Sequence, residues 1–210
     1  MRYVDGMTLL APTLFDHLSE TVATVTIPGL RYLPDFIDAE TEAALLATID
    51  QQPWLHDLKR RVQHYGWRYD YKARGITQDL RIGPIPDWLA GLCEPLSAEG
   101  IFPRAPDQVI INEYQPGQGI SAHVDCVPCF GDIIASLSLS SACVMNFTHA
   151  TTGEKQSHLL EPRSLLILSG DARYHWQHAI PARKTDKWQG KTISRARRIS
   201  LTFRTVLALP

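Results

Sequence analysis

The 210-residue sequence has few cysteines, no excess of either charge and no long uncharged apolar run. Four cysteines are too few to staple a chain of this length, so a secreted disulfide framework has little support, and we expect reduced thiols in a cytoplasm. No uncharged run approaches the ~18 residues of a membrane span. The N-terminal apolar stretch 7–15 is broken by Pro12 and lacks a small-residue cleavage site, so it is a poor signal peptide. These absences predict a soluble protein of the cytoplasm, and we separately expect a monomer.

The balance of charge limits the partners that the whole molecule can attract. Lys and Arg number 21 against 22 Asp and Glu, which leaves a formal charge of -1. A nucleic-acid partner would therefore have to meet a local basic face. Hydrophobic residues make up 44% of the chain, enough to bury the core of one ordinary domain. We expect a single domain over residues 1–210, with a helical or covering extension over about 1–105 and a β-rich core over about 107–207.

Two segments of the first half have helical spacing of apolar residues. The first is capped by Asp38 and runs to about Asp50, where Pro53 stops it. The second starts near Asp87 and ends at Gly100. Both are long enough to pack against a sheet.

From residue 107 onward, short β-rich runs are separated by glycines, prolines and polar clusters. These runs cover residues 109–114, 133–139, 144–148, 165–168 and 199–207. Apolar residues at 133, 135, 137 and 139 alternate with a mainly polar set at 134, 136, 138 and 140, which is typical of a half-buried strand. The pattern favours a mainly β or α+β fold built on an antiparallel barrel or jelly roll.

Cys126 and Cys129 have the spacing of a redox or zinc motif. No second cysteine pair with metal spacing follows, and no βαβ context surrounds them. We interpret them as two free thiols.

His123 and Asp125 form an H-x-D triplet. Residues two apart in an extended segment point to one face, so an imidazole nitrogen and a carboxylate oxygen can meet one ion. A second histidine from a distant strand would complete the two-histidine, one-carboxylate set of non-haem Fe(II) oxygenases. Taken alone the triplet is weak, because a surface histidine near an aspartate also explains it.

Arg198 and Arg204 lie six residues apart, hence on one face of a predicted strand. Two such side chains leaning together could hold both ends of a short dicarboxylate, and a planar guanidinium binds carboxylate bidentately. The alternative is a solvated basic strand.

The stretches INEYQPGQGISAHVD, SLSLSS, RSLLILSGDARYHWQHAI and RRISLTFR, in this order, closely resemble the AlkB family of Fe(II) and 2-oxoglutarate dioxygenases. The match runs from about residue 107 to 206. Upstream, LKRRVQHYGWRYDY and PDQVIINEYQPGQG look most like the branch whose animal member carries its oxygenase domain beside a tRNA methyltransferase. The resemblance implies a double-stranded β-helix, or jelly roll, with N-terminal helices packed on it.

The resemblance also implies two groups of site residues. The iron ligands would be His123, Asp125 and His178, and the 2-oxoglutarate site would use Asn112, Tyr114, Arg198 and Arg204. His175 would be a packing residue or would lie behind the ligands. Ser200 stands where founding members carry asparagine, so hydrogen bonding there departs from the family pattern.

Fe(II), 2-oxoglutarate and O2 are the implied cofactor and co-substrates, and the implied reaction is oxidative demethylation or dealkylation of N-alkylated bases in DNA or RNA, tRNA included. One alternative is a hydroxylase of a modified tRNA base. A second is a non-catalytic nucleic-acid-binding module with a decayed iron site. A protein or small-molecule oxygenase is also compatible with the near-neutral charge.

Residues 61–75 alternate aromatic with polar and charged side chains, in the segment that covers the active site in this family. Aromatic faces stack on bases and arginines contact phosphates, so we expect Trp67, Tyr69 and Arg68 to bind the substrate. The alternative is a strand whose aromatic face, at 65, 67, 69 and 71, belongs to the core.

Overall fold

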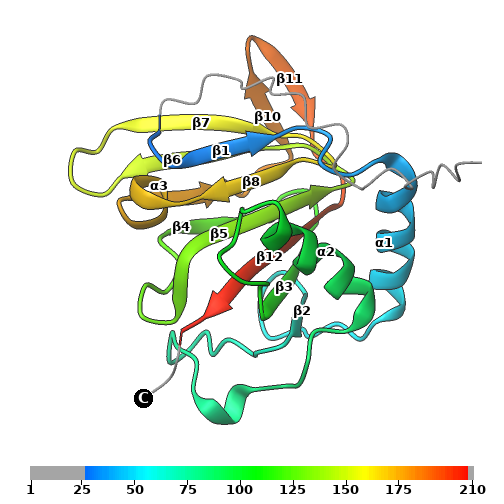
Figure 1. Cartoon of the computed structure of the whole chain (residues 1–210). Helices are drawn as coiled ribbons and strands as arrows, with labels where there is room; N and C mark the ends of the chain where they lie inside the picture. The colour runs from blue at the N-terminus through cyan, green and yellow to red at the C-terminus, as the bar shows by residue number, and fades with distance from the viewer. Residues whose placement is uncertain (1–26, 208–210) are drawn as a thin grey trace, which may run out of the picture.

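The computed structural model describes residues 27–207, so the apolar stretch 7–15 lies outside the described residues. Helices and strands follow one another as in Figure 1. The helical segments are α1 (Ala39–Gln51), the 3-10 turn η1 (Gln78–Leu80), α2 (Asp87–Ala98) and α3 (Gly170–Tyr174). The strands are β1 (Leu30–Leu33), β2 (Val62–Tyr65), β3 (Gln108–Tyr114), β4 (Ile120–His123), β5 (Phe130–Leu139), β6 (Cys143–His149), β7 (Lys155–Leu160), β8 (Leu165–Leu168), β9 (Trp176–Ile180), β10 (Thr185–Trp188), β11 (Lys191–Ser194) and β12 (Arg198–Val206).

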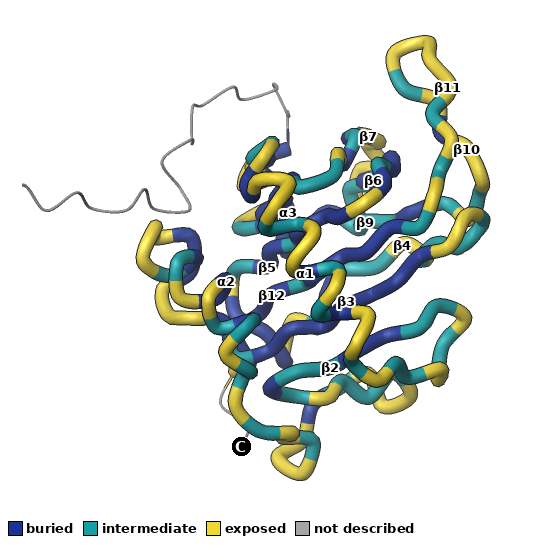
Figure 2. Tube along the Cα trace, turned by 90° about the vertical axis from the view of Figure 1, so that its right-hand side faces the viewer, coloured by how far each residue is buried: buried dark blue, intermediate teal, exposed yellow. Residues whose placement is uncertain are grey.

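Two antiparallel sheets form the body of the molecule. The larger has the strand order β1-β8-β5-β12-β3-β2 and the smaller has the order β4-β9-β6-β7. β10 and β11 pair separately in a hairpin that projects from the body, with most of its length exposed (Figure 2). The antiparallel β fold predicted from the sequence is therefore confirmed, and β1 and β2 bring the first half of the chain into the same sheet as the second.

Both predicted helices are confirmed within a residue or two. The side chain of Asp38 accepts a hydrogen bond from the amide of Thr41 at 2.7 Å, which caps α1, and α2 begins directly after Pro86. Apolar residues of α1 and α2 pack in one core cluster with residues of β3, β5 and β12, so the helices cover one face of the larger sheet (Figure 1). No helix among residues 27–207 is long and apolar enough to cross a membrane.

A second core cluster lies between the two sheets, and this corrects the prediction of a half-buried strand at 133–139. Ile134 belongs to this second cluster, whereas Ala135 and Leu137 belong to the cluster under the helices. Ser138 is fully buried although the sequence pattern placed it on a solvent face. Ser136 and Ser138 of β5 face an interior that contains polar groups. The alternation of apolar and polar residues along this strand therefore distinguishes two buried faces, not a buried face from an exposed one.

The aromatic segment 61–75 is not one continuous strand, so its four aromatic residues do not share a face. β2 ends at Tyr65, and Gly66 follows with φ +75°. A Cβ on Gly66 would lie 1.8 Å from the carbonyl oxygen of Asp107, so only glycine fits this turn. The segment therefore leaves the sheet and crosses toward the space between the sheets.

The expectation of free thiols is wrong for two of the four cysteines. Cys126 and Cys129 form a disulfide in the loop between β4 and β5. The three-residue separation lets one turn bring the two sulfurs together, which the sequence pattern alone did not decide. Cys93 and Cys143 are free and buried.

Candidate active site

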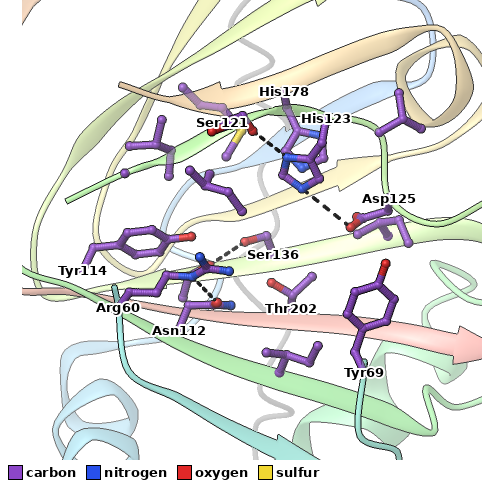
Figure 3. Close-up of a pocket in the computed structure, with 18 of the residues that line it drawn as sticks. Arg60, Tyr69, Asn112, Tyr114, Ser121, His123, Asp125, Ser136, His178 and Thr202 are labelled. Carbon is purple, nitrogen blue, oxygen red and sulfur yellow. Dashed lines mark hydrogen bonds and ion pairs between the residues drawn. The ribbon is translucent and has the colours of Figure 1, made fainter. Parts of the chain in front are cut away.

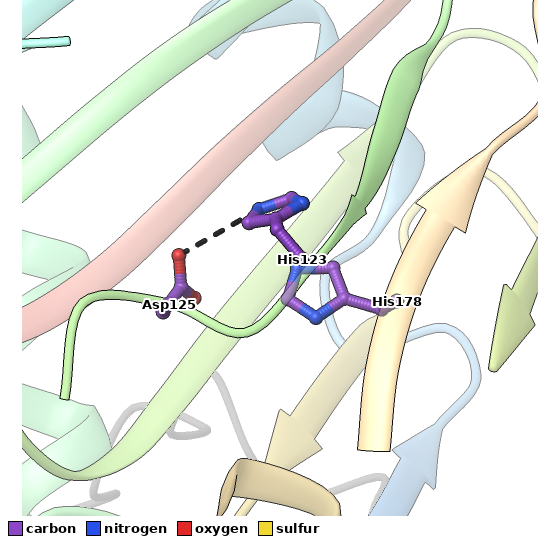
Figure 4. Close-up of side chains that lie close together, drawn as sticks. All are labelled: His123, Asp125 and His178. Carbon is purple, nitrogen blue, oxygen red and sulfur yellow. Dashed lines mark ion pairs between the residues drawn. The ribbon is translucent and has the colours of Figure 1, made fainter. Parts of the chain in front are cut away.

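The register between β4 and β9 brings two distant histidines together. His123 ends β4 and is the direct cross-strand partner of His178 on β9. Their rings lie on the same side of the strand pair with centroids 4.3 Å apart (Figure 4). Pairing of the edge strand β4 with β9 in the smaller sheet therefore supplies the second histidine that the H-x-D triplet required.

Asp125 lies two residues beyond His123, where the strand has given way to a loop. Its Oδ1 is 3.9 Å from Nε2 of His123 (Figure 4). One donor atom from each of His123, Asp125 and His178 lies within 4.8 Å of the others, the one such group of three or more among residues 27–207. His175 is exposed and its ring lies near His149 instead, with centroids 6.3 Å apart.

Each of the two histidines has a ring nitrogen that can bind a metal ion. Nδ1 of His123 lies 2.8 Å from the carbonyl oxygen of Ser121, and because a carbonyl only accepts, Nδ1 is the donor and Nε2 is the nitrogen left for a metal ion. Burial lowers the pKa of His178 to about 4, so its ring is neutral near pH 7. Neutral imidazoles are the form that binds metal.

Asp125 is a buried carboxylate held in its charged form. Burial alone would raise its pKa, but the positive charge of Arg204 beside it, together with that of Arg173, holds the pKa well below its usual range. Nη2 of Arg204 donates to Oδ1 of Asp125 at 3.0 Å. Two imidazoles and one ionised carboxylate fit a divalent iron ion with open positions on the opposite side.

Arg173 holds the loop that carries Asp125. This side chain is only 2% exposed, and its guanidinium donates to the carbonyl oxygens of Asp125, Cys126, Phe130 and Gly131 at 2.9 to 3.4 Å. The loop therefore has a fixed shape from the end of β4 to the start of β5. The sequence reasoning missed this residue, because an arginine in a short helical turn has no pattern that marks it as buried.

The two predicted arginines of β12 face the interior, which excludes the solvated basic strand. Arg198 is 3% exposed and Arg204 is 9% exposed. Nη2 of Arg198 donates to Oγ of Ser138 at 2.7 Å, whereas Nε and Nη1 of Arg198 and Nε of Arg204 are buried without a partner among the described residues. Buried N–H donors without acceptors are costly, so they fit an anionic ligand that would satisfy them.

Asn112 and Tyr114 lie on the same face of β3, next to these arginines. Tyr114 is the cross-strand partner of Arg198, and Asn112 is that of Ser200. Burial raises the pKa of Tyr114, so its hydroxyl stays protonated and available as a donor. Ser200, which departs from the pattern implied by the resemblance, shares a 2.9 Å hydrogen bond between hydroxyl groups with Ser136.

The candidate metal ligands and the predicted co-substrate residues line one cavity of about 690 Å³, part of which is drawn in Figure 3. The predicted residues at its wall are His123, Asp125, His178, Asn112, Tyr114, Arg198, Arg204 and Tyr69. Tyr71 and Arg74, from the aromatic segment, also line it, and the residues of the wall that sequence reasoning missed include Lys59, Arg60 and Ser136. The missed cations come from loops, where no periodicity shows which way a side chain points.

The structure separates the three residues expected to bind substrate. Tyr69 lines the cavity, and in Figure 3 its hydroxyl points toward Asp125. Trp67 packs on the second core cluster, beneath the guanidinium of Arg81 at 6.0 Å, and does not line the cavity. Arg68 also lies outside the wall and pairs with Asp57 at 2.9 Å. The core alternative therefore fits Trp67, whereas Tyr69 is placed where a substrate could reach it.

Comparison with known proteins supports the same chemistry. Residues 29–204 match the 2OG-Fe(II) oxygenase superfamily. The chain is 39% identical over 205 residues to the alkylated DNA repair protein ALKBH8 homolog of Arabidopsis thaliana. The matched region covers 87% of this chain and 59% of that protein. It is 36% identical to Uncharacterized protein L905 of Acanthamoeba polyphaga mimivirus, with 85% of each chain covered.

Two further comparisons bear on domain extent and fold. The chain is 37% identical to the mouse tRNA (carboxymethyluridine(34)-5-O)-methyltransferase ALKBH8 but spans only 31% of that protein. The solved structure of OsALKBH1 superposes with a TM-score of 0.66 at 18% identity, covering 87% of this chain and 99% of that one, which shows the shared jelly-roll fold. The chain therefore belongs to the 2OG-Fe(II) oxygenase superfamily, as a dioxygenase of the AlkB type that uses Fe(II), 2-oxoglutarate and O2.

Proposed function

We propose that this chain oxidatively dealkylates N-alkylated bases in DNA or RNA. The observation that carries the proposal is that one cavity is lined by the His-Asp-His group, by buried arginines with unsatisfied donors and by aromatic side chains of the covering segment. A metal, a dicarboxylate and a planar base can therefore occupy adjoining parts of one space.

His123, Asp125 and His178 would hold the iron. Nε2 of His123 is free because Nδ1 is committed to the carbonyl oxygen of Ser121, and Arg204 keeps Asp125 ionised. Bound iron supplies the activation of O2 coupled to decarboxylation of 2-oxoglutarate, chemistry that side chains alone lack. The chain's own part is to fix the three donors, and Arg173 fixes the one that lies on a loop.

Arg198 and Arg204 would bind the carboxylates of 2-oxoglutarate, with Tyr114 and Asn112 as further donors. The unpaired Nε and Nη1 of Arg198 are buried at the end of the cavity beside Tyr114, where a distal carboxylate would satisfy them. Because Arg204 already contacts Asp125, a carboxylate held near Arg204 lies beside the metal ligands. This arrangement orients the co-substrate along β12.

Tyr69 and Tyr71 would hold the base, and Arg74 would contact its phosphate. These three side chains line the cavity and come from the segment that crosses between the sheets. The two tyrosine rings contact each other at 5.2 Å between centroids. Base stacking on an aromatic ring contributes about 1–3 kcal/mol and tolerates many sequences, so this wall favours a flipped or single-stranded base.

The reaction that follows is oxidation of an N-methyl group. 2-Oxoglutarate loses CO2 and takes up one oxygen atom of O2 to become succinate. The other oxygen atom is inserted into a methyl C–H bond, and the hydroxymethyl product then loses formaldehyde to leave the unmodified base. If the oxidised carbon belongs to a side chain without such a leaving group, the hydroxyl remains. A hydroxylase of a modified tRNA base is therefore the second candidate, favoured by the 37% identity to a protein named for tRNA carboxymethyluridine methylation.

One experiment separates these candidates. The iron-loaded protein is incubated with 2-oxoglutarate, ascorbate and O2 and with methylated DNA, methylated RNA or total tRNA, and nucleosides are analysed by mass spectrometry. Loss of a methyl group with formaldehyde release supports dealkylation, whereas gain of one oxygen atom on a tRNA nucleoside supports the second candidate. Succinate without any change in a nucleoside indicates a protein or small-molecule substrate. Absence of succinate under all conditions would contradict the proposal and favour a binding module.

A further inference from the structure

Arg60 and Arg61 are neighbours whose side chains go to opposite faces of the larger sheet. Nε and Nη2 of Arg61 donate to the two oxygens of the buried carboxylate of Glu113, the latter bond to Oε1 at 2.9 Å. The guanidinium carbon of Arg61 lies 4.6 Å from the centre of the Trp54 ring. Glu113 alternates on β3 with residues that face the cavity. Anchoring of Arg61 on the far side therefore directs Arg60 toward the cavity.

Arg60 is held by contacts to two residues of the co-substrate wall and one of the covering segment. Its Nε donates to Oδ1 of Asn112 at 2.8 Å, and its guanidinium lies 5.7 Å from the ring of Tyr114 and 6.0 Å from that of Tyr71. Figure 3 shows it between Asn112 and Tyr114. Within residues 27–207 it forms no ion pair, unlike Arg61. Its charge is thus not committed to a carboxylate of the protein.

The hydrogen bond to Asn112 decides which end of the amide faces the cavity. An N–H of arginine only donates, so Asn112 must turn its oxygen to Arg60. The amide NH2 is then the group that Asn112 can offer to a ligand. A carboxylate accepts from that NH2 but would be repelled by the amide oxygen, so the orientation of Asn112 selects for an anion.

We propose that Arg60 is a positioning residue for 2-oxoglutarate, orienting Asn112 so that its NH2 donates to a carboxylate of the co-substrate. The inference rests on the proposed co-substrate site. It links that site to the covering segment, because Arg60 also contacts Tyr71, which we place against the base.

Binding of 2-oxoglutarate to the full chain loaded with redox-inert Mn(II), measured by titration calorimetry, tests the inference without turnover. Arg60→Met removes the donor, and we expect about tenfold weaker binding, the effect of one charge-assisted hydrogen bond. Arg60→Lys keeps a donor and should lose clearly less. The control is Arg81→Gln, which removes an exposed cation that lies outside the cavity and should bind like the wild type.

A double-mutant cycle isolates the path through Asn112. If Arg60 acts by orienting that amide, Arg60→Met should weaken binding no more than about twofold in an Asn112→Ala background. The full tenfold loss in that background would overturn the inference. In steady-state assays the KM for 2-oxoglutarate should rise while kcat stays near that of the wild type.

Other outcomes separate this inference from the proposed function. A wild-type protein that does not bind 2-oxoglutarate contradicts the co-substrate site itself. Equal binding by wild type and Arg60→Met, or a loss confined to nucleic-acid affinity, overturns the role of Arg60 alone. Circular dichroism and Mn(II) affinity check folding, and if Arg60→Met does not fold, Arg60→Gln is measured in its place against the same expectations.

Discussion

Arg204 donates from Nη2 to Oδ1 of Asp125 at 3.0 Å, and both side chains are buried. The pair joins the last strand of the larger sheet to the loop after β4. The pair lies where the iron site and the co-substrate site meet. The guanidinium of Arg204 therefore donates to the carboxylate of Asp125 and, in our proposal, also to a carboxylate of the ligand.

Loss of this arginine should destabilise the metal-free protein. Arg204→Met leaves the Asp125 carboxylate buried without its main counter-charge, and breaking a buried pair costs about 3–5 kcal/mol. The measurement is urea denaturation near pH 7, with Arg204→Lys as the charge-conserving control, which should lose much less. A free energy of unfolding for Arg204→Met within 1 kcal/mol of the wild type would contradict the importance of the pair.

Arg198→Lys should weaken 2-oxoglutarate binding by about tenfold or more although the charge is kept. Lysine lacks the planar fork that the unpaired Nε and Nη1 of Arg198 offer to a carboxylate. Calorimetry on the Mn(II)-loaded protein measures the loss, and Mn(II) affinity should change little. Unaltered 2-oxoglutarate affinity would move the dicarboxylate away from this residue.

His178→Ala should abolish stoichiometric metal binding, whereas His175→Ala should retain it. Only His178 lies opposite His123 in the strand register, and His175 is exposed on another part of the molecule. Metal content after dialysis gives the answer. The reverse result, with metal kept in His178→Ala and lost in His175→Ala, would falsify the ligand assignment.

Tyr69→Ala should lower oxidation of an alkylated oligonucleotide by about tenfold while slow, substrate-free succinate formation continues. The loss corresponds to one stacking contact of about 1–3 kcal/mol. Trp67→Ala is the matched control, because Trp67 lies in the same segment but packs on the core, and its substitution should lower stability more than specificity. If both activities fall together in a folded Tyr69→Ala protein, Tyr69 does not act on the substrate.

His64 should make stability depend on pH. Its Nδ1 accepts from the amide of Tyr69 at 3.4 Å, and burial lowers its pKa from 6.5 to about 4. Because the unfolded chain takes up this proton first, stability is lost as pH falls from 6.5 toward 4, by at most about 2 kcal/mol at pH 5. Urea denaturation at pH 7.5 and pH 5 should show a smaller loss in His64→Gln. Parallel losses in the two proteins would show that another group titrates.

Local patterns were sufficient for much of the fold. The helix that begins after Asp38 has its cap and spacing in consecutive residues, and the strand 108–114 has a continuous β-rich run. Strands such as β7 and β9 were missed, because they are short and mix polar with apolar residues. What holds them is pairing with β6, a long-range contact that no local window contains.

Some residues of the candidate site could likewise be predicted from local patterns, and others could not. Residues two or six apart on a strand share a face, so His123 with Asp125 and Arg198 with Arg204 could be proposed as pairs. Arg60 reaches Asn112 across 52 residues and Arg173 reaches Asp125 across 48. Both arginines sit outside long strands, where side-chain direction depends on packing, so periodicity could not find them.

The most direct test of the account is a crystal structure with Mn(II) and 2-oxoglutarate, in which anomalous scattering locates the metal. We predict one metal ion bound by Nε2 of His123, a carboxylate oxygen of Asp125 and an imidazole nitrogen of His178, with the distal carboxylate of 2-oxoglutarate on Arg198. A metal bound elsewhere, or a dicarboxylate that contacts neither Arg198 nor Arg204, would contradict it.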